Sequence, residues 1–182
     1  MSKITTKQIV FSAMAIALAT VISVAIKLPS LPNGGSVTLF SMLIICLIGY
    51  WYGPKISIIA AIAYGILQFI VGPYVVHPLQ IALDYPLAFG ALGLSGFFCN
   101  SKNGLIKGFL AGSMGRLLMH CISGVIFYTT YVGDFVGNVN AIWAGILYNM
   151  SYIIPEVILT LVLLALPPVR TAFSELKKMA LN

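Results

Sequence analysis

Long apolar runs, separated by short stretches of Gly, Pro and polar residues, cover almost the whole chain. The breaks read LPSLPNGGS, YGPK, VGPYVVHP, NSKNG and TTYVGDFVGNVN, and a pair of prolines closes the last run. Gly and Pro end helices, and about 20 apolar residues are enough to cross a bilayer. The pattern predicts six spans, the second of them short, at about residues 8–26, 37–52, 54–71, 79–98, 104–128 and 141–166.

The composition places the chain in the membrane class. Of its 182 residues, 60% are hydrophobic and 8% are charged, with a mean hydropathy of +1.03, whereas soluble domains carry roughly 25% charged residues. We therefore expect an all-α integral membrane protein with one membrane domain over residues 1–182. The first run is long enough to span, and no small-residue cleavage site follows it, so we expect no cleaved signal peptide. Cys46, Cys99 and Cys121 show no metal spacing and are expected to be packing residues.

The basic residues predict the orientation. If the N-terminus is cytoplasmic, the only basic residue in an outside segment is Lys27. The inside segments then hold eight, namely Lys3, Lys7, Lys55, Lys102, Lys107, Arg170, Lys177 and Lys178. This asymmetry follows the positive-inside rule and predicts that both termini are cytoplasmic. The pI near 9.3 is then explained by topology and by contact with anionic lipid, and no nucleic-acid partner is expected.

Several common chemical motifs are missing from the sequence. It contains no GxxxxGK[ST] phosphate loop, so it is not expected to hydrolyse ATP in the usual P-loop manner. It also lacks a His, Cys and carboxylate cluster with metal spacing and an evident Ser–His–Asp set. We therefore expect neither an enzyme nor a bound metal or cofactor.

Small residues spaced four apart mark faces on which helices can approach closely. The first run reads SAMAIALA, which places Ala13 with Ala17 and Ala15 with Ala19 on helical faces. In lipid, such stripes let helix backbones pack, either within the chain or against a partner. The alanine ladder is the best candidate for an external docking face, and internal packing is the alternative.

A few polar residues interrupt the apolar runs, and such residues are functional candidates because they are costly in lipid. At 1.5 Å per residue, Asp84 lies about 8 Å below the outer surface, His120 about 24 Å up from the inner surface, and Asn149 about 12 Å down from the outer surface. These three side chains therefore share one layer in the outer half of the membrane. Tyr85, Tyr128 and Tyr148 lie near it, which predicts a small-molecule pocket open to the outside.

The partner of the buried carboxylate stays open from the sequence. Arg116 lies one helical turn before His120, and an Asp84–Arg116 ion pair is the structural alternative to a ligand contact. Glu156 could instead pair with Arg116 and leave Asp84 for an organic cation, which the aromatic faces would also favour. His120 alone could be a packing residue, and Tyr74 could be an interfacial aromatic.

Four stretches resemble the thiamine-transporter family, the thiamine-specific S-components (ThiT/YuaJ type) of energy-coupling factor (ECF) transporters. They are GGSVTLFSM at 34–42, GPYVVHPLQIALDYPLAF at 72–89, HCISGVIFY at 120–128 and LYNMSYIIPE at 147–156. The resemblance covers nearly the whole chain in order. It implies the six-helix S-component fold in the prokaryotic plasma membrane, with thiamine as ligand and with a coupling transmembrane subunit and two ATPase subunits as partners.

The same resemblance implies roles for individual residues. The residues implied to bind thiamine are Asp84, Tyr85, His120, Gly124, Tyr128, Asn149, Arg116 and Tyr74, and those implied to dock on the coupling subunit are Ala13, Ala15, Ala17 and Ala19. Residues 28–36 are expected to act as a lid. Some relatives carry a lid Trp that is missing here, so either Phe40 or Trp143 replaces it or one stacking contact is lost.

The resulting hypothesis is a non-enzymatic subunit that captures thiamine at the outer face for ATP-driven uptake by its partners. One alternative keeps the fold but takes a thiamine precursor, the hydroxymethylpyrimidine. Another is a self-sufficient proton-coupled thiamine transporter that uses Asp84, His120 or Glu156. A third is a structural or enzyme-accessory membrane protein with no small ligand.

Overall fold

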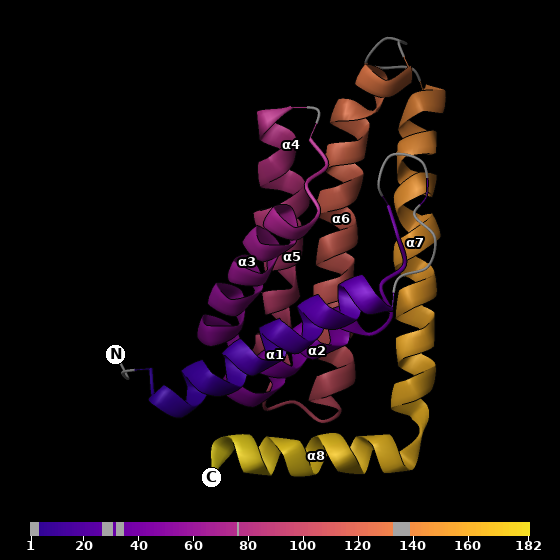
Figure 1. Ribbon diagram of the computed structural model, residues 1–182. Coiled ribbons are helices and arrows are strands. Elements are labelled where there is room, and N and C mark those ends of the chain that lie inside the picture. Colours follow the sequence, from indigo (N-terminus) through magenta and orange to yellow (C-terminus); the bar gives the residue numbers. More distant parts are fainter. Residues whose placement is uncertain (1–3, 27–30, 32–34, 76, 133–138) are drawn as a thin grey trace.

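The computed structural model describes residues 4–26, 31, 35–75, 77–132 and 139–182, without the side chains of residues 128–132 and 139–141. In chain order the elements are α1 (Thr6–Ala25), α2 (Ser41–Tyr52), α3 (Pro54–Val71), α4 (Pro78–Ala82), η2 (Leu83–Leu87), α5 (Ala88–Gly90), η3 (Ala91–Phe98), α6 (Gly104–Val132), α7 (Val139–Ala165) and α8 (Pro167–Leu181). They form a helical bundle with α8 lying across one end, and both termini lie towards that end (Figure 1). The all-α membrane fold is as predicted.

Five helical stretches are long and apolar enough to cross a membrane, namely Thr6–Ala25, Pro54–Val71, Pro78–Phe98, Gly104–Phe127 and Ile142–Ala165. The predicted second span is wrong at its start, because α2 begins only at Ser41. With 12 residues it is about 18 Å long, well short of a ~30 Å hydrocarbon core. Phe40 has a left-handed backbone (φ 66°) and ends the non-helical connection before α2. Six crossings and the cytoplasmic position of both termini stay predictions.

The fourth span is not a uniform α-helix. A π-helical turn, η2, holds Asp84 and Pro86, and a long 3₁₀ segment, η3, follows α5. A proline removes a backbone donor, and π-turns are typical of functional sites, whereas 3₁₀ runs longer than about four residues are uncommon. Glycines let η3 touch α3 closely, since a Cβ on Gly93 would lie 2.6 Å from Ile58 Cα. The fourth span therefore changes from π-helical winding at η2 to 3₁₀ winding at η3, where it packs tightly against α3.

The core forms around α2, which contacts α1, α3, α6, α8 and η3. Its inner positions, among them Met42, Ile45 and Cys46, are fully buried. All three cysteines are free thiols, as expected for packing residues, and Cys46 contacts the Leu92 carbonyl. The short α2 thus serves mainly as a packing centre for the longer helices.

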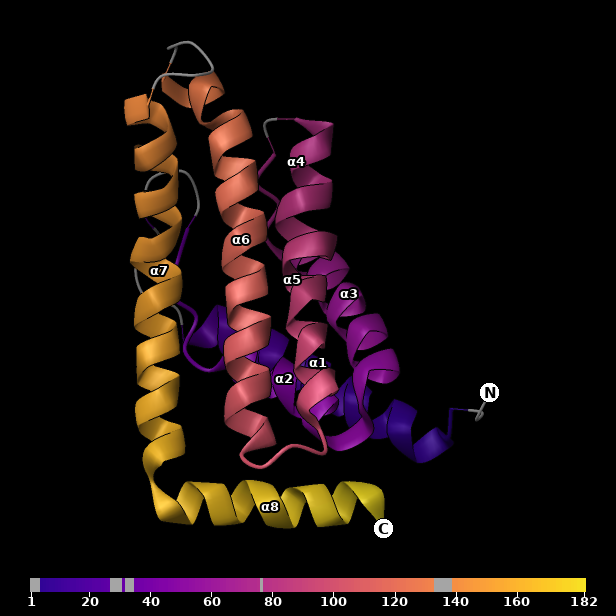
Figure 2. The same ribbon diagram turned by 180° about the vertical axis from the view of Figure 1, so that it is seen from behind.

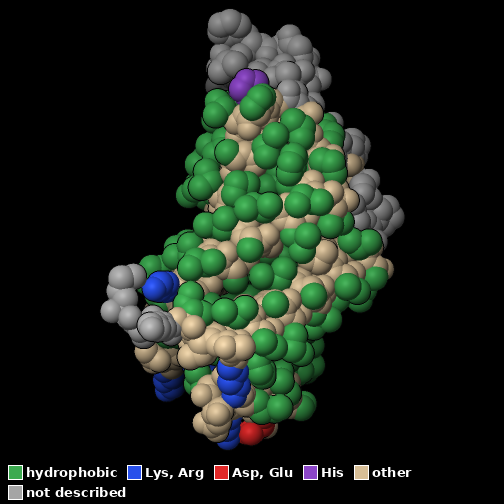
Figure 3. Space-filling view, turned by 60° about the vertical axis from the view of Figure 1, so that its left-hand side comes forward, with side chains coloured by type: hydrophobic (Ala, Val, Ile, Leu, Met, Phe, Trp, Pro, Cys, Tyr) green, Lys and Arg blue, Asp and Glu red, His purple; other side chains and the backbone are tan. Residues whose placement is uncertain are grey.

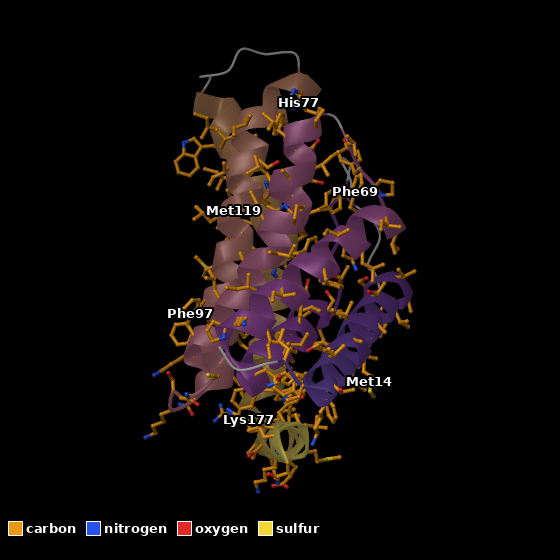
Figure 4. The ribbon with its side chains drawn as sticks, turned by 90° about the vertical axis from the view of Figure 1, so that its left-hand side faces the viewer. Met14, Phe69, His77, Phe97, Met119 and Lys177 are labelled. Atoms are coloured by element: carbon orange, nitrogen blue, oxygen red, sulfur yellow. The ribbon has the colours of Figure 1, made fainter. Side chains whose placement is uncertain are left out.

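The docking face predicted on α1 needs a correction. Ala15 and Ala19 are buried in the chain's own core, with 5% and 0% exposure, so their assignment to an external face is wrong. Ala13 and Ala17 are exposed on the opposite side of α1. Met14, labelled in Figure 4, is exposed with them. A spacing of four recurs on both sides of a helix, and the sequence alone could not tell which stripe faces inward. The docking prediction stays open for Ala13 and Ala17.

Helix α8 is absent from the sequence prediction. It lies across the end of the bundle opposite the pocket (Figures 1 and 2). Its inward residues recur at helical spacing as Val169, Phe173, Lys177 and Ala180. A search for long apolar runs misses it because polar and charged residues from Arg170 to Lys178 interrupt the segment, but this amphipathic spacing could have revealed it.

Lys177 fastens α8 to the bundle. Its ammonium donates to the Cys99 carbonyl at 2.7 Å and lies 4.0 Å from the centroid of the Tyr50 ring. Partial burial lowers the pKa of Lys177. Tyr52 adds a hydrogen bond from its hydroxyl to the Ala180 carbonyl. Figure 4 shows Lys177 where α8 meets the helices above it. Figure 3 shows a largely hydrophobic flank with Lys and Arg gathered towards this end.

Candidate functional site

A cavity of about 350 Å³ lies in the half of the bundle away from α8. Its lining comes from the end of α1, the α1–α2 connection, the end of α3, and the facing sides of α4, η2, α5, α6 and α7. Of the predicted site residues it includes Tyr74, Asp84, Tyr85, Arg116, His120 and Asn149. The structure therefore brings together Asp84, His120 and Asn149, which the rise per residue along the helices placed in one layer of the membrane.

Asp84 and His120 form the polar centre of the cavity. The π-turn η2 presents Asp84, and α6 presents His120, so that Asp84 Oδ1 lies 3.1 Å from His120 Nδ1. Arg116 Nε donates to His120 Nε2 at 3.4 Å. Since Nε2 accepts, the imidazole proton sits on Nδ1 and is donated to Asp84. The carboxylate keeps its second oxygen for another donor or a cation.

Arg116 does not pair with Asp84. Within the described part of the chain the ion pairs are His120–Asp84 and Lys178–Glu175, so both the Asp84–Arg116 and the Glu156–Arg116 pairings considered from the sequence are wrong. The guanidinium of Arg116 lies over the Phe89 ring, 4.3 Å from its centroid. Its Nη1 atom is buried without a hydrogen-bond partner among the described residues. Arg116 as a residue nevertheless belongs to the cavity lining.

Asn149 connects α6 to α7 and also lines the cavity. Its amide nitrogen donates to the carbonyls of His120 (3.0 Å) and Gly145 (2.9 Å). Its oxygen accepts from the Tyr152 hydroxyl at 2.6 Å. Gly124 packs behind this amide, since a Cβ there would lie 2.7 Å from Asn149 Nδ2. Gly124 is not among the described residues that line the cavity, and its expected contact with the ligand stays a prediction.

Tyr85 and Tyr74 form the rim. The Tyr85 hydroxyl donates to the Gly72 carbonyl at 3.1 Å and accepts from the Tyr74 backbone N–H at 2.8 Å. The Tyr85 ring packs edge-on against Phe69, which Figure 4 labels. The side chain of Tyr128 lies outside the described residues, as do residues 28–30 and 32–34 of the expected lid.

Phe40 and Trp143, the two residues expected to replace a lid aromatic, are not among the described residues that line the cavity. Phe40 lies at the start of α2, and Trp143 is 58% exposed on the outside of α7. Besides Tyr74 and Tyr85, the aromatic lining includes Tyr64, Phe89 and two tyrosines of α7, Tyr148 and Tyr152. These rings pack edge-on in pairs, Tyr64 with Phe89 and Tyr148 with Tyr152. A flat ligand therefore meets ring edges and faces from both sides of the bundle.

Sequence reasoning missed a second polar part of the lining. Gln68 on α3 donates to the Ser23 hydroxyl on α1 at 2.9 Å, and both line the cavity together with Tyr64. The missed lining residues thus include Ser23, Tyr64, Gln68, Phe89 and Tyr152. Gln68 was detectable from the sequence as an amide within an apolar run.

The lining suits binding and orientation of a small polar ligand. One carboxylate, several amide and hydroxyl groups and aromatic rings fit a flat organic cation with hydrogen-bonding groups. No cluster of three or more metal-ligating side chains occurs among the described residues. Fold and site together define a multi-spanning membrane protein with a pocket for a small molecule.

The comparisons with known proteins identify the family. Residues 9–174 match the family described as Thiamine transporter protein (Thia_YuaJ). The chain is 31% identical over 152 residues to the thiamine transporter ThiT of Bacillus subtilis (strain 168), covering 75% of this chain and 77% of that protein. It also superposes on a solved structure of ThiT from Listeria monocytogenes with a TM-score of 0.60 and 23% identity, covering 89% and 93% of the two chains.

The chain belongs to the thiamine transporter family. The family resemblance noted from the sequence is thereby confirmed, together with thiamine transport, a non-enzymatic role and a multi-pass location in the cell membrane. The solved ThiT structure supports the fold.

Proposed function

We propose that this chain is the thiamine-capturing S-component of an ECF-type transporter. The main support for this proposal is the position of the Asp84 carboxylate. It is held by His120 beside aromatic rings, in a cavity that lies away from α8 and the termini. Thiamine contains a permanently cationic thiazolium and an aminopyrimidine with hydrogen-bonding nitrogens. An anionic, aromatic and amide-lined cavity is complementary to both rings.

Within this proposal each polar group has a distinct task. Asp84 offers its free oxygen to the cationic ligand, and His120 fixes the rotamer of Asp84 through the 3.1 Å contact. Arg116 lines the cavity and orients the His120 ring through its Nε contact at 3.4 Å. Tyr85 and Tyr74 close the rim. Asn149 positions His120 and leaves one lone pair of its oxygen for the ligand.

Energy for uptake is proposed to come from partner subunits. The sequence has no P-loop, and a coupling transmembrane subunit with two ATPases supplies what the chain lacks. The proposed docking face is the exposed side of α1, where Ala13 and Ala17 allow close helix packing beside Met14 and Leu18.

Reconstitution separates this function from its rivals. Proteoliposomes with the purified chain alone should bind thiamine without accumulating it, and co-reconstitution with a coupling subunit and two ATPases should give ATP-dependent uptake. Accumulation by the chain alone under a proton gradient would instead identify a secondary transporter. A thermal-shift comparison of thiamine with hydroxymethylpyrimidine decides between vitamin and precursor, and stabilisation by neither would contradict a ligand-binding role for the cavity.

A further inference from the structure

Glu156 is a buried carboxylate that the cavity does not use. It lies on α7, is 2% exposed and is not among the described residues that line the cavity. Burying a carboxylate in a membrane protein is costly unless it is hydrogen-bonded. Its two oxygens accept from the Thr38 hydroxyl at 3.3 Å and from the Met42 backbone N–H at 3.4 Å. Both donors belong to the junction between the α1–α2 connection and α2.

This contact takes the place of an N-cap on α2. The residue before the helix, Phe40, has a left-handed backbone and provides no side-chain cap. The first N–H groups of a helix need acceptors, and a negative charge near them is favourable. Glu156 reaches the Met42 N–H across 114 positions of sequence. The start of α2 is therefore held by a side chain from α7.

A second contact ties the same connection to α7 higher up. The Gly35 N–H donates to the Tyr148 hydroxyl at 2.8 Å, and a Cβ on Gly35 would lie 2.7 Å from that oxygen. From residue 148 to residue 156 the helix rises about 12 Å, and three extended steps from residue 35 to residue 38 cover about 10 Å. Residues 35–38 thus form a strip along α7, fastened at both ends. We name this strip the pocket wall, because Gly35, Ser36 and Thr38 line the cavity.

We propose that Glu156 is a positioning residue that holds the pocket wall against α7 and thereby slows the release of bound thiamine. The inference rests on the thiamine-binding role proposed above. Glu156 acts through Thr38 and α2, not by touching the ligand. Two side chains of α7, Tyr148 and Glu156, hold the pocket wall. Tyr148 also lines the cavity, so of the two only Glu156 can be substituted without altering the cavity lining.

The test is the dissociation rate of labelled thiamine from the purified chain, chased with unlabelled vitamin. Glu156→Leu removes both acceptors at similar size and should raise the dissociation rate constant about tenfold, which corresponds to about 1.4 kcal/mol. The association rate constant should change much less. Glu156→Gln keeps one acceptor oxygen and should fall between Glu156→Leu and the unsubstituted chain. Thr160→Val is the matched control, a fully buried hydroxyl one turn away on α7 with no partner among the described residues.

Substitutions at Thr38 test the contact from its other side. Thr38→Val removes the donor and should speed release, whereas Thr38→Ser keeps the hydroxyl and should restore the slow rate. The double variant Glu156→Leu/Thr38→Val should be no faster than Glu156→Leu alone, because the contact that Thr38→Val removes is one of the two that Glu156→Leu already removes. Glu156→Gln carries the test if Glu156→Leu fails to fold, because Thr38 itself lines the cavity.

The outcomes separate this inference from the proposed function. If the unsubstituted chain binds no thiamine, the proposed function fails and the inference fails with it. If the chain binds thiamine, but Glu156→Leu or Glu156→Gln releases it no faster than Thr160→Val, only the inference is overturned. Multiplicative effects in the double variant would also overturn it.

Discussion

The two halves of the fourth span pack against the same neighbours, α3 and α6, but with opposite results. Around η2 the side chains are large or polar, as with Asp84, Phe89 on α5 and Arg116 on α6, and they surround a cavity. Around η3 the glycines Gly93 and Gly96 bring its backbone against α3, with added Cβ atoms 2.6 and 2.5 Å from the Cα atoms of Ile58 and Pro54. One apolar run thus builds a hollow at one end and a dense contact at the other, and side-chain size decides which.

The largest expected effect comes from filling the dense half. Gly93→Val would place atoms within 3 Å of the Ile58 backbone, and such overpacking costs about 1–3 kcal/mol. We expect a clear fall in the thermal unfolding temperature in detergent. Gly72→Ala is the control, since nothing lies within 4 Å of a Cβ there. Equal stability of the two variants would contradict the close packing described for η3.

Changes in the hollow half should act on affinity instead. Asp84→Asn removes the charge that faces a cationic ligand, and His120→Ala removes the group that orients it. Each should raise the thiamine Kd at least about tenfold, or 1.4 kcal/mol, with little loss of thermal stability. Isothermal titration calorimetry is the suitable measurement, because neither Trp51 nor Trp143 is among the described cavity-lining residues. Unchanged affinity in both variants would contradict the site assignment.

A smaller effect is expected where α8 meets the dense half. Lys177→Met removes the donor to the Cys99 carbonyl and the cation above the Tyr50 ring. The loss should be about 1 kcal/mol of stability, the size of one hydrogen bond, with thiamine affinity unchanged. Thermal unfolding and calorimetry on the same sample would check both parts. A weakened affinity would show that the two halves are coupled.

The smallest effect is expected from Arg116→Lys. Lysine keeps the positive charge near Phe89 but cannot reproduce the geometry of Nε donating to His120. We expect Kd to rise about two- to threefold, or about 0.5 kcal/mol. Arg116→Met, which keeps length without charge, serves as the comparison in the same titration. If Arg116→Lys weakened binding as much as Arg116→Met, the geometry of the guanidinium and not its charge would be the important property.

The sequence predicted those features that depend on distance along a helix. The bounds of α3 were correct because Gly53 precedes it, Pro54 is its first residue and Gly72 follows it. The shared layer of Asp84, His120 and Asn149 followed from the rise per residue alone. The start of α2 was wrong because Val37, Leu39 and Phe40 are apolar yet belong to the connection before the helix. Val37 and Leu39 pack in or against the core, and hydrophobicity does not distinguish such a connection from a helix in lipid.

Features that depend on rotation about a helix axis could not be predicted. Which partner Asp84 meets depends on the π-turn, because an inserted residue turns the following side chains relative to α6. The same uncertainty applied to the two alanine stripes of α1, of which one proved to be buried. Gly124 was found by resemblance and Asn149 by its depth in the membrane, but only packing shows that Gly124 supports the amide of Asn149.

The 3₁₀ winding of η3 gives this segment a repeat of three. Leu94 and Phe97 are exposed, whereas Leu92, Gly93, Ser95 and Gly96 between and around them are buried. With three residues per turn, an exposed position returns to the same angle each turn and forms a straight outward stripe parallel to the axis. Phe97 marks this stripe in Figure 4. A pattern of two small or buried residues followed by one large apolar residue is therefore a signature with which such segments can be sought in other membrane sequences.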